Sequence, residues 1–475
     1  MLTEVLTKAL LRYIVLAPVA TSLSSPGMHT QSEPIQARRA VTELSAQGSP
    51  DQAYTIFTNP AEDCSTSMNI SWASPPGTQC EIEVTDLNRN KTYIYDYDNG
   101  EEEIVGVPSA VYEYGDEAND GASLKSPRLC RTFDNIPSKL ADGKDVREQH
   151  VFDKHDYTLF DLTPNTKYRY RIITVNPDTG RRQYSDTYYF RTAGAKAWKA
   201  AIIGDFHHYA PLPSRLEAAM GMLDTLEDEA AGYDWVLSTG DVCAWGGSYN
   251  FWTELSEQPQ FKDHMWASVQ GNHDHESKDK EKSDNFFRDS HFFPHNGYPG
   301  QEGVSYWFRY GDVLFLMLNT NMPGGLHPSL EWMEEVVQAH PSKYIVVVEH
   351  HQWLVGTDGS DSQLDRVRNV FDRIGVDLAI SGDNHVYLRT KPIYDRQVVE
   401  PEEGTVYIVT PSSDDSRGRE IKPLRDNEDI IAKRWSEGAH TVGAMTMDVN
   451  PRRIQMTLYD RYGTPQDAFT IPAKR

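Results

Sequence analysis

The stretch AAIIGDFHH, residues 200–208, joins four apolar residues through Gly204 to an aspartate and two histidines. A short apolar run bounded by glycine predicts a buried strand. Gly204 lets the chain turn sharply where that strand ends, so the next polar side chains can point into a shared cleft. This stretch therefore predicts a strand that delivers polar side chains to a site.

The same arrangement recurs along the second half of the chain. Further apolar runs lie at residues 235–237, 344–348 and 378–380, and helical patterns lie at residues 216–231, 330–339 and 364–374. Strands that alternate with helices and read as continuous apolar runs predict an α/β layered core. Such cores bind ligands beyond the carboxyl ends of their strands.

Polar clusters stand at those predicted strand ends. Aspartate, asparagine and histidine are ligands suited to divalent metals. A single such cluster is more often an ordinary turn, but five in series indicate a metal site. The five clusters are Gly204–His208, Gly240-Asp241, Gly271-Asn272-His273-Asp274, Glu349-His350-His351 and Gly382-Asp383-Asn384-His385.

Residues 50–195 have β-type patterns instead. Residues 68–72 alternate, and residues 167–173 form a long β-rich run. The segment from Tyr157 to Ile172 resembles the corner between two strands of a fibronectin type III-like sandwich, with Tyr168 expected to pack back on the turn. The acidic stretch 96–120 is expected to be a surface insertion. We therefore expect a β-sandwich here.

The order of the polar clusters resembles that of the metallophosphoesterase superfamily, in its purple acid phosphatase-like branch with an N-terminal fibronectin-like domain. The stretch GDNHVYLR, residues 382–389, continues the likeness. The resemblance implies a mixed α+β and α/β fold, with an N-terminal β-sandwich followed by a layered α/β/β/α metallophosphoesterase domain. The expected divisions are a signal-like segment and linker at 1–48, the sandwich at 50–195 and the catalytic domain at 196–475.

The resemblance also implies ligands for two divalent metal ions (Mn, Fe, Zn, Mg or Ca). One ion would be held by Asp205, His207, Asp241 and His385. The second would be held by Asp241, Asn272, His350 and Asp383, so that the Asp241 carboxylate bridges both ions.

Other side chains would contact the substrate. A hydroxide between the ions would attack the phosphoryl group in line. His273 would face the leaving group as an acid or as a charge stabiliser, without binding metal. His208, His351 and Arg389 are candidates for phosphate contact, and each reads equally well as an ordinary surface residue.

Two positions depart from the purple acid phosphatase pattern. Ala244 stands where that branch has a metal-binding tyrosine, and His207 would fill the vacated coordination position. Asp383 replaces the first histidine of a Gly-His-x-His motif. Its carboxylate would shift metal preference from zinc toward harder ions, or would leave the second ion weakly held.

The composition of the chain restricts the kinds of partner that the protein can bind. A formal net charge of −24 argues against nucleic-acid binding and against docking on anionic membranes. The apolar run near the N-terminus, interrupted by Arg12, predicts a signal peptide, with an amphipathic start as the alternative. It is too short for a membrane span. A secreted, periplasmic or envelope-facing protein is expected.

The four cysteines neither demand nor forbid disulfides. Cys64 and Cys80 lie at a spacing that allows a bridge across a hairpin, whereas Cys243 reads as a free buried thiol.

The sequence thus predicts an enzyme that hydrolyses small-molecule phosphate monoesters or diesters. The alternative is a non-catalytic or single-metal binding protein on the same fold, because of Asp383. The natural substrate and the oligomeric state stay open.

Overall fold

The computed structural model describes residues 52–75, 77–96, 129–139, 145–195, 197–275, 286–321, 327–354, 364–424 and 428–473. The predicted signal-like segment with its linker and the predicted acidic insertion lie outside these ranges, apart from Asp96. No helix in the described ranges is long and apolar enough to cross a membrane.

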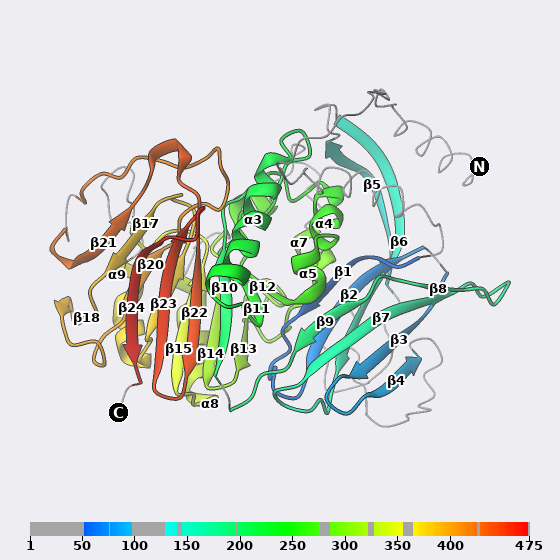
Figure 1. Ribbon diagram of the computed structural model, residues 1–475, viewed down its shortest axis with the longest axis horizontal. Coiled ribbons are helices and arrows are strands. Elements are labelled where there is room, and N and C mark those ends of the chain that lie inside the picture. Colours follow the sequence, from blue (N-terminus) through cyan, green and yellow to red (C-terminus); the bar gives the residue numbers. More distant parts are fainter. Residues whose placement is uncertain are drawn as a thin grey trace, which may run out of the picture.

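The N-terminal part contains two antiparallel sheets (Figure 1). The first has the order β1 (Tyr54–Asn59), β2 (Met68–Ser74), β6 (Asp145–Leu159), β5 (Leu129–Lys139). The second has the order β4 (Lys91–Asp96), β3 (Gln79–Asp86), β7 (Lys167–Val175), β8 (Arg182–Tyr184), and β9 (Tyr188–Arg191) also pairs with β7.

Buried side chains connect the two sheets. The Thr58 and Tyr170 hydroxyls are hydrogen-bonded at 2.7 Å, and the rings of Tyr95 and Tyr157 lie 5.8 Å apart. At the turn before β7, the Thr163 backbone N–H donates to the Tyr168 hydroxyl at 2.8 Å. Tyr168 therefore packs back on that turn, as its place in the sequence predicted.

The second half is built on two further sheets, in which the predicted apolar runs form parallel strands. One sheet has the order β12 (Met265–Ser268), β11 (Trp235–Ser238), β10 (Trp198–Ile203), β22 (Gly443–Asn450), β23 (Arg453–Asp460), β24 (Pro465–Pro472). The other has the order β13 (Tyr306–Tyr310), β14 (Val313–Leu318), β15 (Tyr344–Glu349), β16 (Leu378–Ser381), β20 (Val406–Val409), β17 (Tyr387–Thr390), β21 (Ile431–Trp435). A small hairpin joins β18 (Ile393–Tyr394) to β19 (Gln397–Val398).

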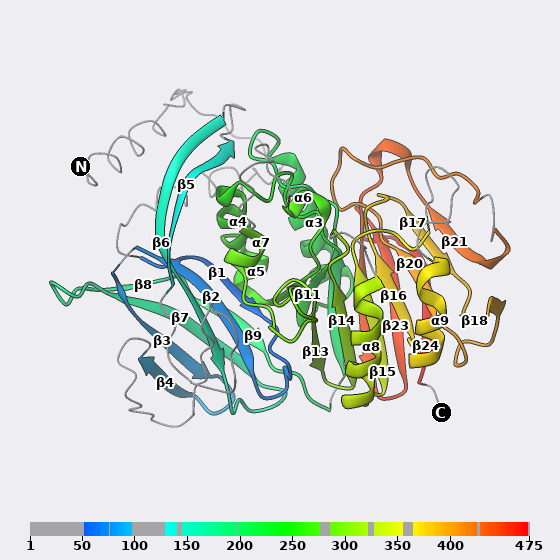
Figure 2. The same ribbon diagram turned by 180° about the vertical axis from the view of Figure 1, so that it is seen from behind.

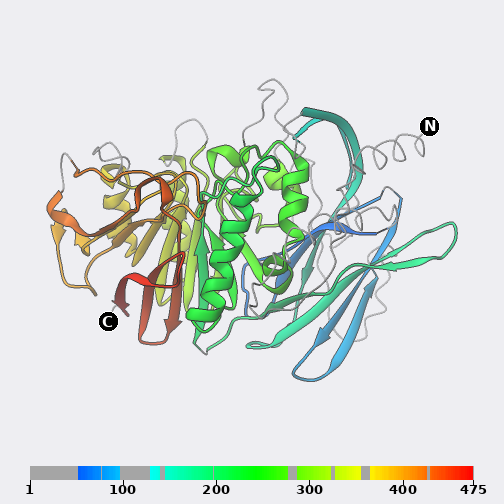
Figure 3. The same ribbon diagram turned by 45° about the horizontal axis from the view of Figure 1, so that its top comes forward.

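Strand alternation places these sheets between layers of helices. Along β15, Val346 and Val348 face the core shared with the first sheet, while Ile345 and Val347 face the helices α8 (His327–Ala339) and α9 (Leu364–Ile374) (Figure 2). On the far side, α3 (Ser214–Glu229) lies along β10 and β22, as its green ribbon shows in Figure 3. The helix–sheet–sheet–helix layering agrees with the prediction.

Three short helices join the two halves. They are α4 (Tyr249–Ser256), α5 (Pro259–Asp263) and α7 (Phe286–Ser290), and all three contact β1. Asn59 of β1 donates to the Trp266 carbonyl at 3.0 Å and accepts from the Phe292 N–H at 2.9 Å. One continuous apolar core therefore runs from β2 through to β10.

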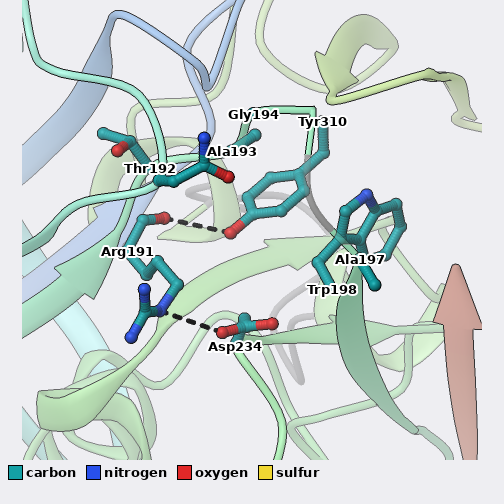
Figure 4. A pocket seen from close by; sticks show the side chains of 9 residues that line it. Arg191, Thr192, Ala193, Gly194, Ala197, Trp198, Asp234 and Tyr310 are labelled. Carbon is teal, nitrogen blue, oxygen red and sulfur yellow. Dashed lines mark hydrogen bonds and ion pairs between the residues drawn. The ribbon is translucent and has the colours of Figure 1, made fainter. Parts of the chain in front are cut away.

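A small cavity of about 180 Å³ lies where the chain passes from β9 to β10 (Figure 4). Arg191 on one side pairs with Asp234 at 3.1 Å, and the Tyr310 hydroxyl donates to the Arg191 carbonyl at 3.0 Å. These contacts hold the two halves together at their covalent joint.

The cysteines correct one expectation. Cys64 and Cys80 are both buried and are not joined by a disulfide, so the bridge allowed by their spacing does not form. The Cys64 thiol lies against the Met265 sulfur at 3.9 Å, and the Cys80 sulfur accepts from the Trp72 indole at 3.4 Å. Cys243 is a free buried thiol, as predicted.

Candidate metal centre

Six of the predicted ligands lie just after the carboxyl ends of four parallel strands, and the seventh is the first residue of a short helix. Asp205 and His207 follow β10, Asp241 follows β11, and His350 follows β15. Asn272 opens the four-residue helix α6 (Asn272–His275) after β12, and Asp383 and His385 follow β16. Parallel strands bring these ends to one edge of each sheet. We call these seven residues the strand-end cluster.

The backbone of the strand-end cluster is left-handed at five positions. The φ angles are positive at Asp205 (54°), His207 (46°), Asp241 (51°), Asp383 (64°) and His385 (60°). Residues other than glycine adopt this region uncommonly, at a cost of about 1–3 kcal/mol each when the surroundings impose it. Backbone strain of this kind concentrates at functional sites, so these turns support a functional reading.

Two groups of ligand atoms share the Asp241 carboxylate. The His207 Nε2 lies 3.1 Å from the Asp241 Oδ2, and the His385 Nε2 lies 3.6 Å from the Asp205 Oδ1. On the other side, the His350 Nε2 lies 3.4 Å from the same Asp241 Oδ2. Asp241 therefore stands between two sets of possible metal ligands.

The His350 ring lies close to the other residues of the second set of possible metal ligands. Its Nε2 lies 3.2 Å from the Asn272 Oδ1 and 3.9 Å from the Asp383 Oδ1. The Asp383 N–H also donates to Asp205, at 3.0 Å to Oδ1. The structure thus brings all seven predicted ligands together.

The imidazoles of the strand-end cluster are held in the orientation that metal binding needs. The Nδ1 atoms of His207, His350 and His385 each lie 2.8–2.9 Å from a backbone carbonyl, which can only accept a hydrogen bond. Each Nδ1 therefore carries a hydrogen, and each Nε2 points into the cluster, where a neutral ring can offer its lone pair to a metal ion. Carbonyl contacts of this kind fix the ligand tautomer at metal sites.

This arrangement places two hydrogen-bond acceptors opposite each other. In the neutral tautomer the buried His207 Nε2 lone pair faces the Asp241 oxygen, and among the described residues that atom has no hydrogen-bond donor. Two facing acceptors need a cation or a shared proton between them. The donor set therefore fits metal ions.

The electrostatics point the same way. Burial lowers the pKa of His207 to about 4, so its imidazole is neutral at physiological pH. Burial, with added repulsion from Asp241 and Asp383, raises the pKa of Asp205 well above its ordinary value. Burial would raise the pKa of Asp241 too, but the charge of His350 opposes burial, and the pKa of Asp241 lies well below its ordinary value. Buried carboxylates this close call for positive charge.

His273 lies beside the first set. Its backbone N–H donates to the Asp241 Oδ1 at 2.8 Å, and its Nδ1 lies 3.1 Å from the Ala244 carbonyl. The ring is half-buried and 4.8 Å from the His207 ring, centroid to centroid. His273 also falls within reach of a metal between His207 and Asp241, a role that the sequence reading did not give it.

The three predicted phosphate contacts are placed differently. His351 lies next to the cluster, with its ring 5.3 Å from His350 and its Nδ1 2.6 Å from the Thr320 hydroxyl. His208 is buried, and its Nε2 lies 2.7 Å from the Glu254 carboxylate. The Arg389 guanidinium is held by both oxygens of Asp467 at 2.6 and 3.1 Å. His208 and Arg389 are thus each paired with a carboxylate, and their contact with phosphate stays a prediction.

Two residues near the cluster were left unassigned by sequence reasoning. Asp274 accepts from the Val242, Cys243 and Gly271 N–H groups, each at 2.9 Å, and so ties the turn after β11 to the turn after β12. Burial and the charge of Asp241 raise the pKa of Asp274 to about 7, against the effect of its N–H donors. Its place in the Gly-Asn-His-Asp motif was the available signal.

The second is Arg417, whose carbonyl accepts from the His385 Nδ1 at 2.9 Å. It follows β20, an apolar run that ends in Thr410-Pro411-Ser412-Ser413-Asp414. An apolar run followed by polar residues is the same pattern as at the other strand ends. It was the available signal for Arg417, but it was not used to predict a site residue there.

Comparisons with known proteins agree with this geometry. Residues 199–387 match the calcineurin-like phosphoesterase family. Purple acid phosphatase 21 of Arabidopsis thaliana is 22% identical over 299 residues, which are 60% of this chain and 64% of that protein. The match thus spans less than two thirds of that relative.

Two solved structures share the fold. The purple acid phosphatase PPD1 from yellow lupin (Lupinus luteus) seeds has a TM-score of 0.65 at 16% identity, over 90% of this chain and 75% of that one. PhoD has a TM-score of 0.53 at 11% identity, over 90% of this chain and 93% of that one.

Proposed function

Because residues 199–387 form a calcineurin-like phosphoesterase domain, in a metallophosphoesterase of the purple acid phosphatase-like branch, we propose that the chain hydrolyses phosphate esters at a centre for two divalent metal ions. The observation that carries the proposal is the position of the Asp241 carboxylate between the His207 and His350 Nε2 atoms.

The seven residues of the strand-end cluster divide into two ligand sets. Asp205, His207, Asp241 and His385 would hold one ion; Asp241, Asn272, His350 and Asp383 would hold the other. Bound together, such ions draw charge from a phosphoryl group and make water a stronger nucleophile at neutral pH. Ala244 has no side chain that can bind a metal, and His207 would occupy the coordination position in its place.

His273 is proposed to act at the ester bond. Its Nδ1–H donates to the Ala244 carbonyl, which directs Nε2 toward the cluster. In its protonated form, Nε2–H can be donated to the ester oxygen that leaves as the phosphorus–oxygen bond breaks. His351, held by Thr320, is proposed with His208 and Arg389 as a candidate for phosphate contact.

Asp383 decides between this function and its alternative, a single-metal or non-catalytic binding protein. Its side chain is 30% exposed, and its oxygen is the most distant of the three that surround the His350 Nε2. A carboxylate there favours Mn²⁺, Fe²⁺, Mg²⁺ or Ca²⁺ over Zn²⁺.

Two features beyond the site belong to the same proposal. Residues 50–195 are proposed to form a fibronectin type III-like sandwich, supported by the two antiparallel sheets and the Tyr168 contact. A secreted or envelope-facing location is proposed from the apolar N-terminal run.

The test is hydrolysis by purified protein supplied separately with Mn²⁺, Zn²⁺, Fe²⁺ and Ca²⁺. We expect release of p-nitrophenol from p-nitrophenyl phosphate or from its bis ester, and two bound ions per chain by elemental analysis. Asp241→Ala removes the shared carboxylate and should abolish both. Activity no greater than that of Asp241→Ala, with one ion or none, would establish the alternative.

A further inference from the structure

The turn that follows β14 reaches the metal centre without supplying any of its predicted ligands. We call Asn319, Thr320 and Asn321 the β14 turn. The Asn319 N–H donates to the Ser305 hydroxyl at 2.9 Å, and the Asn319 Oδ1 accepts from the Asn321 N–H at 3.1 Å. The Asn321 side-chain amide donates to the Gln270 carbonyl at 2.8 Å. The β14 turn is therefore fixed to the segment that joins β12 to α6.

Within this fixed turn, Thr320 holds the side chain of His351. Thr320 is 8% exposed, and its hydroxyl lies 2.6 Å from the His351 Nδ1. The His351 ring is half-buried and lies 5.3 Å from the His350 ring, centroid to centroid. Its Nε2 has no hydrogen-bond partner in the described part of the chain and is not one of the fully buried polar atoms there. This nitrogen is therefore open to a ligand that enters the site.

The partner of Nδ1 separates His351 from His350. The His350 Nδ1 faces the Thr239 carbonyl, which only accepts, so that this Nδ1 carries a hydrogen. The His351 Nδ1 faces a hydroxyl, which has a hydrogen to donate. Among the described residues, that Nδ1 is the only hydrogen-bond partner of the Thr320 hydroxyl. Because a nearly buried hydroxyl needs an acceptor, Thr320 donates to Nδ1, and the neutral His351 ring carries its own hydrogen on Nε2.

The two adjacent histidines therefore present opposite groups to the site. A neutral His350 offers a lone pair, which suits a metal ion, whereas His351 offers an N–H, which suits an anionic oxygen. We propose that Thr320 is a positioning residue that sets the His351 Nε2–H to donate to a phosphate oxygen of the substrate. This inference rests on the proposed function. It gives His351 a hydrogen-bonding role and keeps it out of the two ligand sets.

The first experiment measures hydrolysis of p-nitrophenyl phosphate by the full, metal-loaded chain, with inorganic phosphate as a competing inhibitor. The bis ester takes its place if only that ester is cleaved. Thr320→Val replaces the hydroxyl by a methyl group of similar size. It should raise KM and the inhibition constant of phosphate by about 3- to 10-fold, the usual effect of a lost hydrogen bond, and change kcat much less. Thr320→Ser retains the hydroxyl and should recover most of the loss.

Thr405→Val is the matched control. The Thr405 hydroxyl is buried and donates to the Val376 carbonyl at 2.7 Å. Thr405 precedes β20, at the opposite end of the parallel strands from the strand-end cluster. This variant therefore loses a comparable hydrogen bond away from the site, and it should leave KM and the inhibition constant unchanged.

A double variant tests whether Thr320 acts through His351. His351→Phe has no imidazole to position, so adding Thr320→Val to it should cause no further rise in KM. Metal content is measured for every variant. Losses that add in the double variant, no loss in Thr320→Val, or a loss of bound metal from Thr320→Val would each overturn the proposal.

The position of the hydrogen can be measured without turnover. In protein with isotope-labelled histidine, long-range nitrogen–proton correlation spectra distinguish a neutral ring with its hydrogen on Nε2 from one with its hydrogen on Nδ1. The His351 signals are identified by their absence from His351→Phe. We expect the hydrogen on Nε2 in the wild type, and a neutral His351 with its hydrogen on Nδ1 would overturn the proposal.

Wild-type protein that hydrolyses neither ester would instead contradict the proposed function. Calorimetric titration of the metal-loaded protein with inorganic phosphate then tests Thr320 independently. Weaker phosphate binding by Thr320→Val than by the wild type, recovered in Thr320→Ser, supports the assignment. Equal binding by all three proteins, or no binding by the wild type, overturns it.

Discussion

Asp383 differs from its neighbouring carboxylates in exposure. Its side chain is 30% exposed, whereas those of Asp205 and Asp241 are 0% and 2% exposed. It is therefore the ligand position that can be exchanged with the least disturbance to packing. Histidine tolerates the positive φ there better than most residues.

Exchanging this ligand should change the choice of metal. We expect Asp383→His to raise the affinity for Zn²⁺ relative to Mn²⁺ by about tenfold or more, because imidazole suits zinc and carboxylate suits manganese. Competitive metal loading followed by elemental analysis measures the ratio. The exposed Glu400→His variant serves as the control. An unchanged ratio would show that Asp383 does not contact the metal.

Asp274 acts on the site through the backbone. One of its oxygens accepts from Val242 and Cys243, and the other accepts from Gly271. In Asp274→Asn the new amide must place a donor against an N–H donor, so we expect a loss of about 1–3 kcal/mol in the free energy of unfolding. Urea denaturation measures it, with Asp312→Asn as the exposed comparison. Equal stability of the two variants would exclude this role.

At the scale of elements, the segment that follows α7 packs a histidine among aromatic rings. The His291 ring lies 4.4 Å from Phe57 and 4.9 Å from Phe293, centroid to centroid. Burial lowers the pKa of His291 to about 3. A neutral, buried imidazole of this kind makes the joint between α7 and β1 sensitive to acid.

The direction in which pH changes the free energy of unfolding follows from proton uptake by the unfolded chain. Below pH 6.5 the unfolded chain binds a proton at His291 that the folded chain excludes until about pH 3. Its stabilising contribution is present above pH 6.5 and falls by about 1.4 kcal/mol per pH unit toward pH 3. We expect His291→Phe to reduce the slope of unfolding free energy between pH 6.5 and 5, measured in guanidinium, while His440→Phe at an exposed position does not. Parallel slopes for wild type and His291→Phe would contradict this.

The elements that the sequence predicted well are those whose signal is local. The apolar runs of β10, β11, β15 and β16 each stop at a glycine or a polar residue, and the structure places a strand at each run. Six of the seven ligands were found because they lie just after such a run, whereas Asn272 follows β12 and was found from its place in the series of clusters. The partners of His208 and Arg389 could not be found this way, because Glu254 and Asp467 are distant in sequence and meet them only through packing. Arg417 lies eight residues beyond the end of β20, and its carbonyl reaches His385 only because the loop after β20 is hydrogen-bonded to the turn after β10.

At the scale of the whole molecule, the two halves share one core, so we expect them to unfold together. Calorimetry should give a single transition with equal calorimetric and van't Hoff enthalpies. Asn59→Ala removes the bonds to Trp266 and Phe292 and should lower stability by about 2–4 kcal/mol while keeping one transition. Two separated transitions in the wild type would show that the halves are independent.

At the left-handed turns of the strand-end cluster, the residue that would be most stable is not the residue that activity needs. Glycine adopts a positive φ at no steric cost, so the backbone at Asp383 alone would favour Asp383→Gly. That variant would gain up to about 1 kcal/mol of backbone relief and lose a ligand. Laboratory selection for heat resistance should therefore accumulate glycines at these turns and erode function, and only selection on turnover would keep the aspartates and histidines in place.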